Sequence, residues 1–382
     1  MNNKQRQIAS QIFSDIAREL RSGQRNTQIT IGLTTVGSEI EIMELVAGAQ
    51  EAQNRVPGLK VVVIGDVDNL PLPSVKAKTD EEVARILDEM LGSGEIQGAV
   101  AMHYPFPIGV ATVGKIITPY QGKNMYIATT TGTSDTNRVQ AMIKNAVLGI
   151  AVAKADGVEN PTVGILNVEG ARQVERHLNI MQSNGFAFTW GETQRQDKGC
   201  IQRGNDLIRG SVDVLVTDSL TGNIIMKVFS AYCSGGNYEV LGYGYGPGVG
   251  KDFERIICIL SRASGKPVVS GAIEYCAAMV RGNLVQIAQE ELNRAEKAGL
   301  TIPDDQEKHR NTDEAEVIEP PSKVVDCQIA GIEIFDLDDA VKTLWKNSIF
   351  ASSGMGCTGP VVMVAGEDYA EATRLLKEAG YI

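Results

Sequence analysis

The sequence has few of the residues from which metal centres and disulfide frameworks are built. Of its 382 residues only three are histidine and six are cysteine, and no two cysteines form a C-x-x-C pair. Zinc ribbons and disulfide scaffolds need such closely spaced residues. We therefore expect no metal, no cofactor and no disulfide, as in a protein of the reducing cytoplasm.

Aromatic residues and excess positive charge are also scarce. Aromatics make up 5% of the chain, and the net charge is −11. Nucleic-acid binding depends on basic surfaces and often on aromatic stacking, so a nucleic-acid partner is not expected. A hydrophobic content of 43% with 40 glycines instead favours a globular α/β enzyme with many turns.

Long apolar runs are missing as well. The longest uncharged stretch, 96–114, is interrupted by His103, Pro105 and Pro107, and is too broken to span a membrane. The N-terminal residues 1–28 are charged and lack the apolar core of a signal peptide. We expect a cytoplasmic protein without a membrane partner.

Short β-branched runs alternate with segments of helical periodicity, which predicts a mainly parallel sheet flanked by helices. Strands are expected over 28–33, 59–64, 98–102, 125–128, 162–167, 212–217 and 256–260. Helices are expected over 8–20, 41–53, 80–91 with Thr79 or Asp80 as N-cap, 137–156, 171–184, from about 224, and over most of 272–291. Ligands bind outside the carboxyl ends of such strands, so functional residues are sought there.

An acidic stretch rich in proline divides the chain into an α/β domain over 1–300, a linker over 301–322 and a C-terminal module over 323–382. The module is expected to contain helices over 336–346 and 368–379 and a strand over 361–365. A module this short has a limited core and should dock on the main domain or on a partner.

Cys357 lies in an unusual glycine-rich turn of the module, Ser352 to Pro360. Backbone N–H groups of such a turn can stabilise a thiolate, which makes the cysteine a candidate nucleophile. Gly356, Thr358 and Gly359 are the neighbours that could support an oxyanion. The alternative is a turn that merely contains a cysteine.

Three segments that follow strands are candidate phosphate sites. Thr131, Gly132, Thr133 and Ser134 form a loop rich in hydroxyl groups; Thr221, Gly222 and Asn223 precede a helix; Ser261 and Arg262 lie in a short loop with a cation. Backbone N–H groups, hydroxyls and guanidinium groups all bind phosphate. The respective alternatives are an N-cap cluster, a tight turn and solvated surface charge.

Other residues have weaker assignments. His103 follows a strand and is a candidate general base, although such a histidine more often only hydrogen-bonds within a packed loop. The glycine-rich segment 241–250 lacks the context of a dinucleotide-binding loop, and we interpret it as a mobile loop on the substrate side. Cys233, Cys258 and Cys276 lie in apolar patterns and are expected in the core.

A family resemblance adds to these assignments. The segments NAVLGI (145–150), GVENPTVGILN (157–167), Gly204-Asn205, DVLVTD (213–218) and Thr221-Gly222-Asn223 resemble, in order and spacing, the phosphate acyltransferases of phospholipid synthesis. The resemblance covers residues 29–282. It implies an isocitrate-dehydrogenase-like fold and the formation of acyl phosphates from acyl thioesters.

A narrower resemblance covers essentially the whole chain. The loops 129–135 and 168–172 depart from the acyltransferase pattern, and with the ending GMGCTGP (354–360) they resemble the alpha subunits of component C of glycine/sarcosine/betaine reductases. The resemblance implies that a carboxymethyl group arrives from selenoprotein A, becomes an acetyl thioester and is released by phosphate as acetyl phosphate. It also implies a beta subunit similar to type III ketoacyl synthases, an oligomeric complex, and Cys357 as the reactive cysteine.

Two alternative functions remain open. The chain could be a free-standing phosphate acyltransferase that acts on acyl carrier protein. It could also be a non-catalytic scaffold for the beta subunit, since the loop after Asn167 departs from the acyltransferase pattern.

Overall fold

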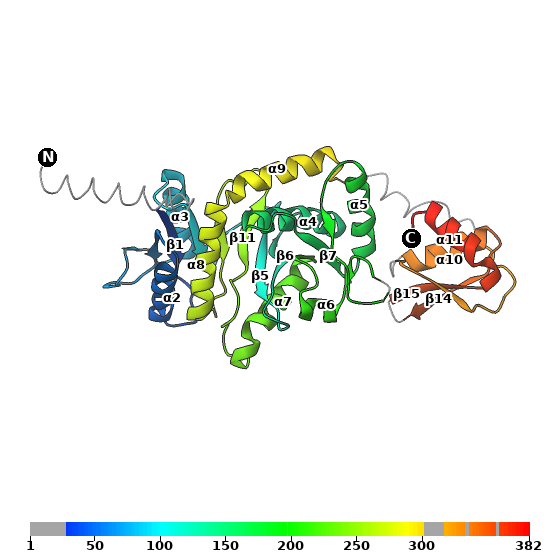
Figure 1. Cartoon of the computed structure of the whole chain (residues 1–382), viewed down its shortest axis with the longest axis horizontal. Coiled ribbons are helices and arrows are strands. Elements are labelled where there is room, and N and C mark those ends of the chain that lie inside the picture. The colour runs from blue at the N-terminus through cyan, green and yellow to red at the C-terminus, as the bar shows by residue number, and fades with distance from the viewer. Residues whose placement is uncertain (1–27, 197, 302–316, 333–335, 357–358) are drawn as a thin grey trace, which may run out of the picture.

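The structure, a computed structural model, describes residues 28–196, 198–301, 317–332, 336–356 and 359–382. The helix expected over 8–20 therefore lies outside the described residues. The described chain forms a large mixed sheet covered by helices on both faces and a separate three-stranded sheet with two helices (Figure 1).

The large sheet confirms the predicted α/β class, because most of its neighbouring strands are parallel. Its order is β3-β2-β1-β4-β12-β11-β5-β6-β10-β7-β8, with β9 also beside β7. The strands are β1 (Ile29–Thr34), β2 (Leu59–Ile64), β3 (Ser74–Val75), β4 (Gly98–Ala101), β5 (Val110–Ile117), β6 (Asn124–Thr133), β7 (Thr162–Leu166), β8 (Thr189–Trp190), β9 (Ile201–Gln202), β10 (Val214–Val216), β11 (Gly246–Gly250) and β12 (Ile257–Ile259).

The helices form two layers that sandwich this sheet. They are α2 (Ile42–Arg55), α3 (Asp80–Ser93), α4 (Arg138–Ala155), α5 (Ala171–Ser183), α6 (Gly204–Arg209), α7 (Ser219–Ala231), α8 (Lys266–Arg281) and α9 (Leu284–Lys297). One core cluster joins α2, α4, α5, α8 and α9 to one face of the sheet, while separate clusters join α3 and α7 to the other. Residues of β6 alternate between the faces, as the period of a strand requires: Tyr126 and Ala128 join the first cluster, Met125 and Ile127 that of α7.

Strand β11 joins the two halves of the sheet and runs antiparallel to both β12 and β5. Because β6 is in turn antiparallel to β5, the parallel strands of the two halves point in opposite directions. The register nevertheless brings their carboxyl ends together. Gly246 pairs with Ile259 at the end of β12, and Gly248, two residues on, pairs with Thr112, which pairs with Thr131 near the end of β6. Along the strand direction the offset is two residues, about 7 Å, and across the sheet β12 and β6 are three strand spacings, about 14 Å, apart.

The glycines of β11 are required by packing. A Cβ at Gly246 would lie 1.8 Å from the Val113 carbonyl oxygen, and one at Gly248 would lie 2.4 Å from the Phe106 ring. The whole strand is buried. The interpretation of 241–250 as a mobile loop is therefore wrong for its second half, because the glycines serve close strand packing and not mobility.

Several other predictions need correction. Strand β5 was not predicted, α7 begins at Ser219 instead of near Ile224, and the segment 272–291 belongs to two helices that meet at Gly282-Asn283. Cys258 and Cys276 are buried as expected, but Cys233 is exposed because it lies in the short 3-10 helix after α7. Thr79 is confirmed as the N-cap of α3, since its side chain accepts the Glu82 N–H.

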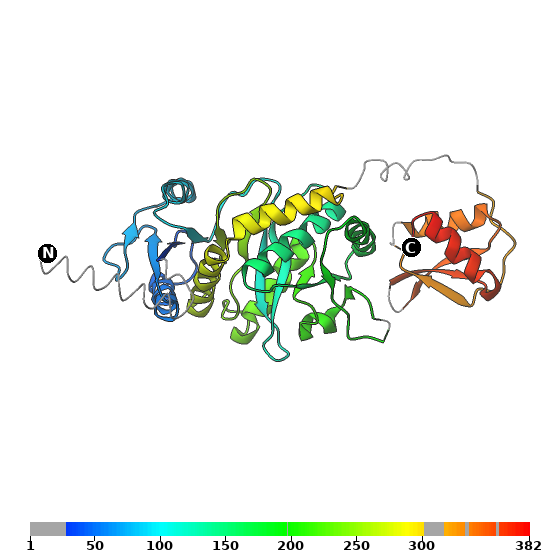
Figure 2. The ribbon, with the colours of Figure 1, turned by 45° about the horizontal axis from the view of Figure 1, so that its top comes forward.

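The C-terminal module contains a sheet of order β13-β15-β14, built from Cys327–Ala330, Gly359–Val364 and Ala351–Gly356, with α10 (Leu337–Lys346) and α11 (Tyr369–Glu378). It has its own hydrophobic cluster, centred on Leu344, Val362 and Leu376. In both views it lies beside α5, at the end of the molecule away from α2 (Figures 1 and 2). Gln173 Nε2 and Arg176 Nη1 of α5 donate hydrogen bonds to Asp336 and to the Tyr381 carbonyl of the module.

Within the described residues, none of the helices has the length and apolar character needed to cross a membrane.

Candidate functional site

Three of the predicted phosphate-binding segments meet where the two halves of the sheet join. The segment of Thr131 ends β6, Thr221 to Asn223 lie in the first turns of α7, and Ser261 follows β12. Asn223 Nδ2 donates a 3.0 Å hydrogen bond to the Thr130 carbonyl. The Thr130 hydroxyl donates at 2.8 Å to the carbonyl of Tyr245, the residue before β11. The site is thus built around the start of β11.

In the loop at the end of β6, the hydroxyl groups of Thr133 and Ser134 already donate hydrogen bonds within the chain. Ser134 is buried and its hydroxyl donates to Asn145 Oδ1 at 2.7 Å, while the Thr133 hydroxyl donates to the Asp135 carbonyl at 2.6 Å. Gly132 has φ +73° and packs against the Val110 carbonyl, where a Cβ would lie 2.6 Å away. The Thr131 side chain, near the end of β6, is half-buried.

The N-terminus of α7 is occupied by a carboxylate of the chain. Asp218 is the N-cap, and it accepts the Thr221 N–H at 3.0 Å and the Thr221 hydroxyl at 2.7 Å. Burial would raise the pKa of Asp218, but these hydrogen bonds and the Arg138 guanidinium outweigh burial and lower it. Gly222 packs on the Thr129 carbonyl, where a Cβ would lie 1.8 Å away. Thr221 and Gly222 therefore already have structural roles, and if they bind phosphate they do so in addition to these contacts.

Lys227, one turn beyond Asn223 on α7, places a cation between the segments. Its Nζ lies 2.6 Å from the Ser261 hydroxyl and 2.8 Å from Glu239 Oε1. The lysine side chain is 49% exposed, whereas that of Glu239 is 2% exposed. Lys227 thus lies at the boundary between the protein interior and solvent, where an anion can reach it.

Glu239 is held by three donors. Besides Lys227, the Ser264 hydroxyl donates to Oε2 at 3.0 Å and the Tyr245 hydroxyl donates to Oε1 at 3.1 Å. Burial and the neighbouring Glu239 carboxylate raise the pKa of Tyr245 well above its ordinary value, so the phenol keeps the proton that it donates. The network fixes the carboxylate, and the carboxylate fixes the ammonium group of Lys227.

Arg262 and His103 border the site on the side of the first half-sheet. Arg262 Nη2 lies 3.4 Å from Asp80 Oδ2 at the start of α3. His103 is exposed, and it lies close to Glu81, the residue after Asp80 in α3. The pKa of Glu81 is lowered, chiefly by its own backbone N–H, with a smaller contribution from His103. Both predicted residues therefore lie near the first turn of α3, and Arg262 directly follows Ser261, which contacts Lys227.

Sequence reasoning missed Lys227, Glu239 and Tyr245. Lys227 is the only charged residue in the sequence of α7, SLTGNIIMKVFSA, and a single charge in an apolar helix was an available signal. Glu239 and Tyr245 belong to the segment between α7 and β11. Their meeting with Lys227 depends on long-range packing that local patterns do not encode.

Cys357 and Thr358 lie outside the described residues. The flanking residues are described: Gly356 and Gly359 pair across the ends of β14 and β15. The expected turn around Cys357 is thus shorter than predicted, because Ser352 and Ser353 are already paired within β14. The roles assigned to Gly356, Cys357, Thr358 and Gly359 stay predictions.

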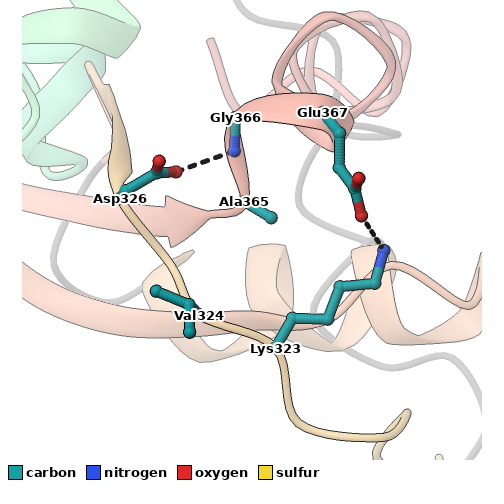
Figure 3. A pocket seen from close by; sticks show the side chains of 6 residues that line it. All are labelled: Lys323, Val324, Asp326, Ala365, Gly366 and Glu367. Atoms are coloured by element: carbon teal, nitrogen blue, oxygen red, sulfur yellow. Dashed lines mark hydrogen bonds and ion pairs between the residues drawn. The ribbon is translucent and has the colours of Figure 1, made fainter.

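A hollow of about 430 Å³ lies on the module, lined by Lys323, Val324, Asp326, Ala365, Gly366 and Glu367 (Figure 3). Lys323 pairs with Glu367 and with Asp368, both at 2.8 Å, and Asp326 accepts the Gly366 N–H. The lysine is neutralised and the lining is acidic, so an anion is not favoured there. Among the described residues no group of three His, Cys, Asp or Glu side chains is placed to hold a metal.

Comparison with known proteins shows the family of the chain. Residues 29–363 match the family described as fatty acid synthesis protein. The chain is 48% identical to the glycine/sarcosine/betaine reductase complex component C subunit alpha of Peptoclostridium acidaminophilum, over 99% of each chain. It is 26% identical over 237 residues to the phosphate acyltransferase of Thermotoga petrophila, which covers 53% of this chain and 68% of that protein. A solved branched-chain phosphotransacylase from Enterococcus faecalis V583 shares 19% identity with a TM-score of 0.45, over 66% of this chain and 99% of that one.

Proposed function

Because the chain belongs to the fatty acid synthesis protein family, and within it to the group of the glycine/sarcosine/betaine reductase component C alpha subunits, we propose that it transfers an acetyl group from a thioester to phosphate. It does so as one subunit of a reductase complex, together with a beta subunit. The acetyl group derives from a carboxymethyl group bound to selenium on a selenoprotein of the same complex. As the C–Se bond breaks, the methylene carbon takes up a proton and the electron pair, the selenium is oxidised to a selenenyl sulfide with a thiol of the selenoprotein, and the carboxyl group loses water as it forms the thioester.

The observation that supports acyl transfer to phosphate is the position of Lys227. Its ammonium group lies 2.6 Å from the Ser261 hydroxyl, which follows β12, and one turn of α7 before it Asn223 contacts the Thr130 carbonyl in β6. A phosphate there would meet the half-exposed ammonium group of Lys227, which also pairs with Glu239, and the Ser261 hydroxyl. Charge-assisted hydrogen bonds of this kind are the strong ones in anion binding.

The proposed reaction balances without a cofactor. A phosphate oxygen attacks the thioester carbonyl carbon, a C–O bond forms, and the C–S bond breaks. The proton of hydrogen phosphate goes to the leaving thiolate, so the products are acetyl phosphate and a thiol. Lys227 lowers the charge repulsion around the phosphate as it approaches and holds it in one orientation. His103 is the candidate to assist the proton transfer.

Cys357 is the proposed carrier of the acetyl group. The support is its sequence context, GMGCTGP, and the match with the reductase subunit over the C-terminal module. Cys233, the exposed cysteine at the end of α7, is a matched control because it is accessible but has no such context.

The experiment uses the chain assembled with the beta subunit. The complex is incubated with acetyl phosphate, and peptide mass spectrometry locates the acetyl group; arsenate-dependent breakdown of acetyl phosphate gives the rate. We expect the acetyl group on Cys357. In Cys357→Ala both the acetylation and the arsenate-dependent breakdown of acetyl phosphate should be lost, whereas in Cys233→Ala both should remain as in wild type. Full activity of Cys357→Ala would refute the carrier role. A complex that is never acetylated would favour the scaffold.

A second assay separates the remaining alternative, to which the similarity with the phosphate acyltransferase of Thermotoga petrophila gives weight. The isolated chain is given acyl carrier protein loaded with an acyl group, with and without phosphate. Phosphate-dependent release of free carrier protein in the absence of a partner would identify a free-standing phosphate acyltransferase. We expect no release under these conditions.

A further inference from the structure

The face of the sheet opposite to α7 holds a buried charge that has no part in the proposed reaction. Lys115 of β5 and Asp156, directly after α4, form an ion pair of 2.5 Å, and their side chains are 12% and 9% exposed. The ammonium group lies 4.5, 5.1 and 5.9 Å from the ring centroids of Tyr243, Tyr275 and Tyr126. The Tyr126 hydroxyl donates to the same carboxylate at 2.6 Å. We name these five residues the Lys115 cage.

The Lys115 cage is filled by a lysine of the chain itself. Aromatic rings around an ammonium group are the means by which proteins bind cationic ligands, and each such contact is strengthened when water is excluded. Here the cage instead holds together the segments that carry its members. Four members belong to β5, β6, α8 and the end of α4, whereas Tyr243 comes from the segment between α7 and β11. The cage therefore fixes this connecting segment to the sheet.

The connecting segment leads directly into the candidate site. Tyr245 follows Tyr243 by two residues, its hydroxyl donates to Glu239 Oε1 at 3.1 Å, and its carbonyl accepts the Thr130 hydroxyl. The Tyr245 ring also lies 5.8 Å from the Lys227 ammonium group. A displacement of the segment would therefore move two groups that surround Lys227.

The two tyrosines reach opposite faces of the sheet. Tyr243 packs with the core cluster on the cage side, and Tyr245 belongs to the cluster of α7. Residues two apart in a regular strand share a face, but Gly244 between them has φ +71°, which redirects the chain. The segment is also closely packed, since a Cβ at Gly244 would lie 3.0 Å from the Ile259 carbonyl oxygen and one at Gly271 would lie 3.2 Å from the Tyr243 ring. A segment packed this tightly transmits a shift at one tyrosine to the other.

From this connection we propose, on the basis of the proposed function, that Tyr243 and Lys115 are positioning residues of the phosphate site. They do not touch phosphate. The Lys115 cage fixes Tyr243, the segment thereby fixes Tyr245 and Glu239, and these hold the ammonium group of Lys227 in place before phosphate arrives. If the segment is loosened, the ammonium group must be ordered during binding, which weakens the affinity for phosphate.

The kinetic test uses Tyr243→Leu, which removes one ring and leaves the ion pair of Lys115 intact. The complex with the beta subunit exchanges labelled phosphate into acetyl phosphate, and initial rates are measured at varied phosphate. We expect the KM for phosphate to rise at least about threefold with kcat within about twofold of wild type, and Tyr243→Phe, which keeps the ring, to restore the KM. The matched control is Phe188→Leu, which removes a half-buried ring from an aromatic cluster beside β8. It should lower stability without changing the KM.

Urea unfolding of the full chain tests the connection without any activity. Tyr245→Phe removes the hydroxyl that holds Glu239. If the segment couples the two faces, Tyr243→Leu/Tyr245→Phe should lose less unfolding free energy than the sum of the two single losses, whereas Phe188→Leu/Tyr245→Phe should be additive.

Additive losses for Tyr243→Leu and Tyr245→Phe would overturn the positioning role. So would an unchanged KM in Tyr243→Leu when Lys227→Met lowers kcat/KM for phosphate. Coupled losses together with a Lys227→Met variant of wild-type kcat/KM would support the connection and refute the phosphate site of the proposed function, so the two failures are distinguishable.

Discussion

Lys227→Met tests the candidate site most directly, because it removes the cation while keeping a side chain of similar length. A hydrogen bond to a charged group contributes about 1.5–3 kcal/mol. If Lys227 binds phosphate in the transition state, kcat/KM for phosphate should fall about 10- to 150-fold, at 1.36 kcal/mol for each factor of ten. Lys227→Arg retains the charge and should lose much less.

The same substitution also affects stability, and the two effects must be separated. It leaves the Glu239 carboxylate buried without its counter-charge. Breaking a fully buried pair costs about 3–5 kcal/mol, but Lys227 is half exposed and Ser264 and Tyr245 still donate to the carboxylate, so we expect about 1–2 kcal/mol. In Lys227→Met/Glu239→Gln the buried charge is removed as well, and the free energy of unfolding should return to within about 1 kcal/mol of wild type.

Urea unfolding and initial rates at varied phosphate, measured on wild type, Lys227→Met, Glu239→Gln and Lys227→Met/Glu239→Gln, complete this double-mutant cycle. The structure predicts that the double variant regains stability but not the lost kcat/KM for phosphate. If the rate returns with the stability, Lys227 acts only by compensating Glu239. If Lys227→Met changes kcat/KM for phosphate by less than twofold, the phosphate lies elsewhere.

Three further predictions concern the fold around the site. Gly246→Ala forces a Cβ to within 1.8 Å of a carbonyl oxygen at φ +82° and should cost more than about 3 kcal/mol of unfolding free energy in urea, or prevent folding. Lys115→Met removes the counter-charge of the 9% exposed Asp156 side chain, which keeps the Tyr126 hydroxyl as a donor, and should cost about 3 kcal/mol of unfolding free energy. Adding Asp156→Asn should restore part of this loss in the same assay. The pKa of Asp218 is lowered in the folded protein, because hydrogen bonds outweigh burial. The ionised carboxylate therefore stabilises the fold at pH values above its unfolded pKa near 3.8, and this stabilisation is lost as the pH falls through the folded pKa. Asp218→Asn should accordingly flatten the pH dependence of thermal unfolding below pH 4.

The elements with strong local signals were predictable from the sequence. Strand β2 and helix α3 with its Thr79 cap agree with expectation to within two residues, since β-branched runs and capping residues act locally. Strand β11 was not, because its Gly-Pro-Gly-Val-Gly composition is typical of a loop. Only close packing against two neighbouring strands makes a buried strand of it.

Only part of the candidate site could be predicted from local sequence signals. Residues just after strands, such as Thr131 and Ser261, could be found from the rule that ligands bind at carboxyl ends. The rule does not say that the two halves of the sheet run in opposite directions, or that β11 brings their ends together. The rule therefore could not identify Glu239. The division of the chain at residues 300 and 322 stays a prediction, because 302–316 lie outside the described residues.

Helix α7 connects the two halves of the candidate site. Asn223 and Lys227, one turn apart on this helix, reach the Thr130 carbonyl in β6 and the Ser261 hydroxyl after β12. One helix therefore holds groups from both halves of the sheet, so a displacement of α7 would disturb both contacts at once.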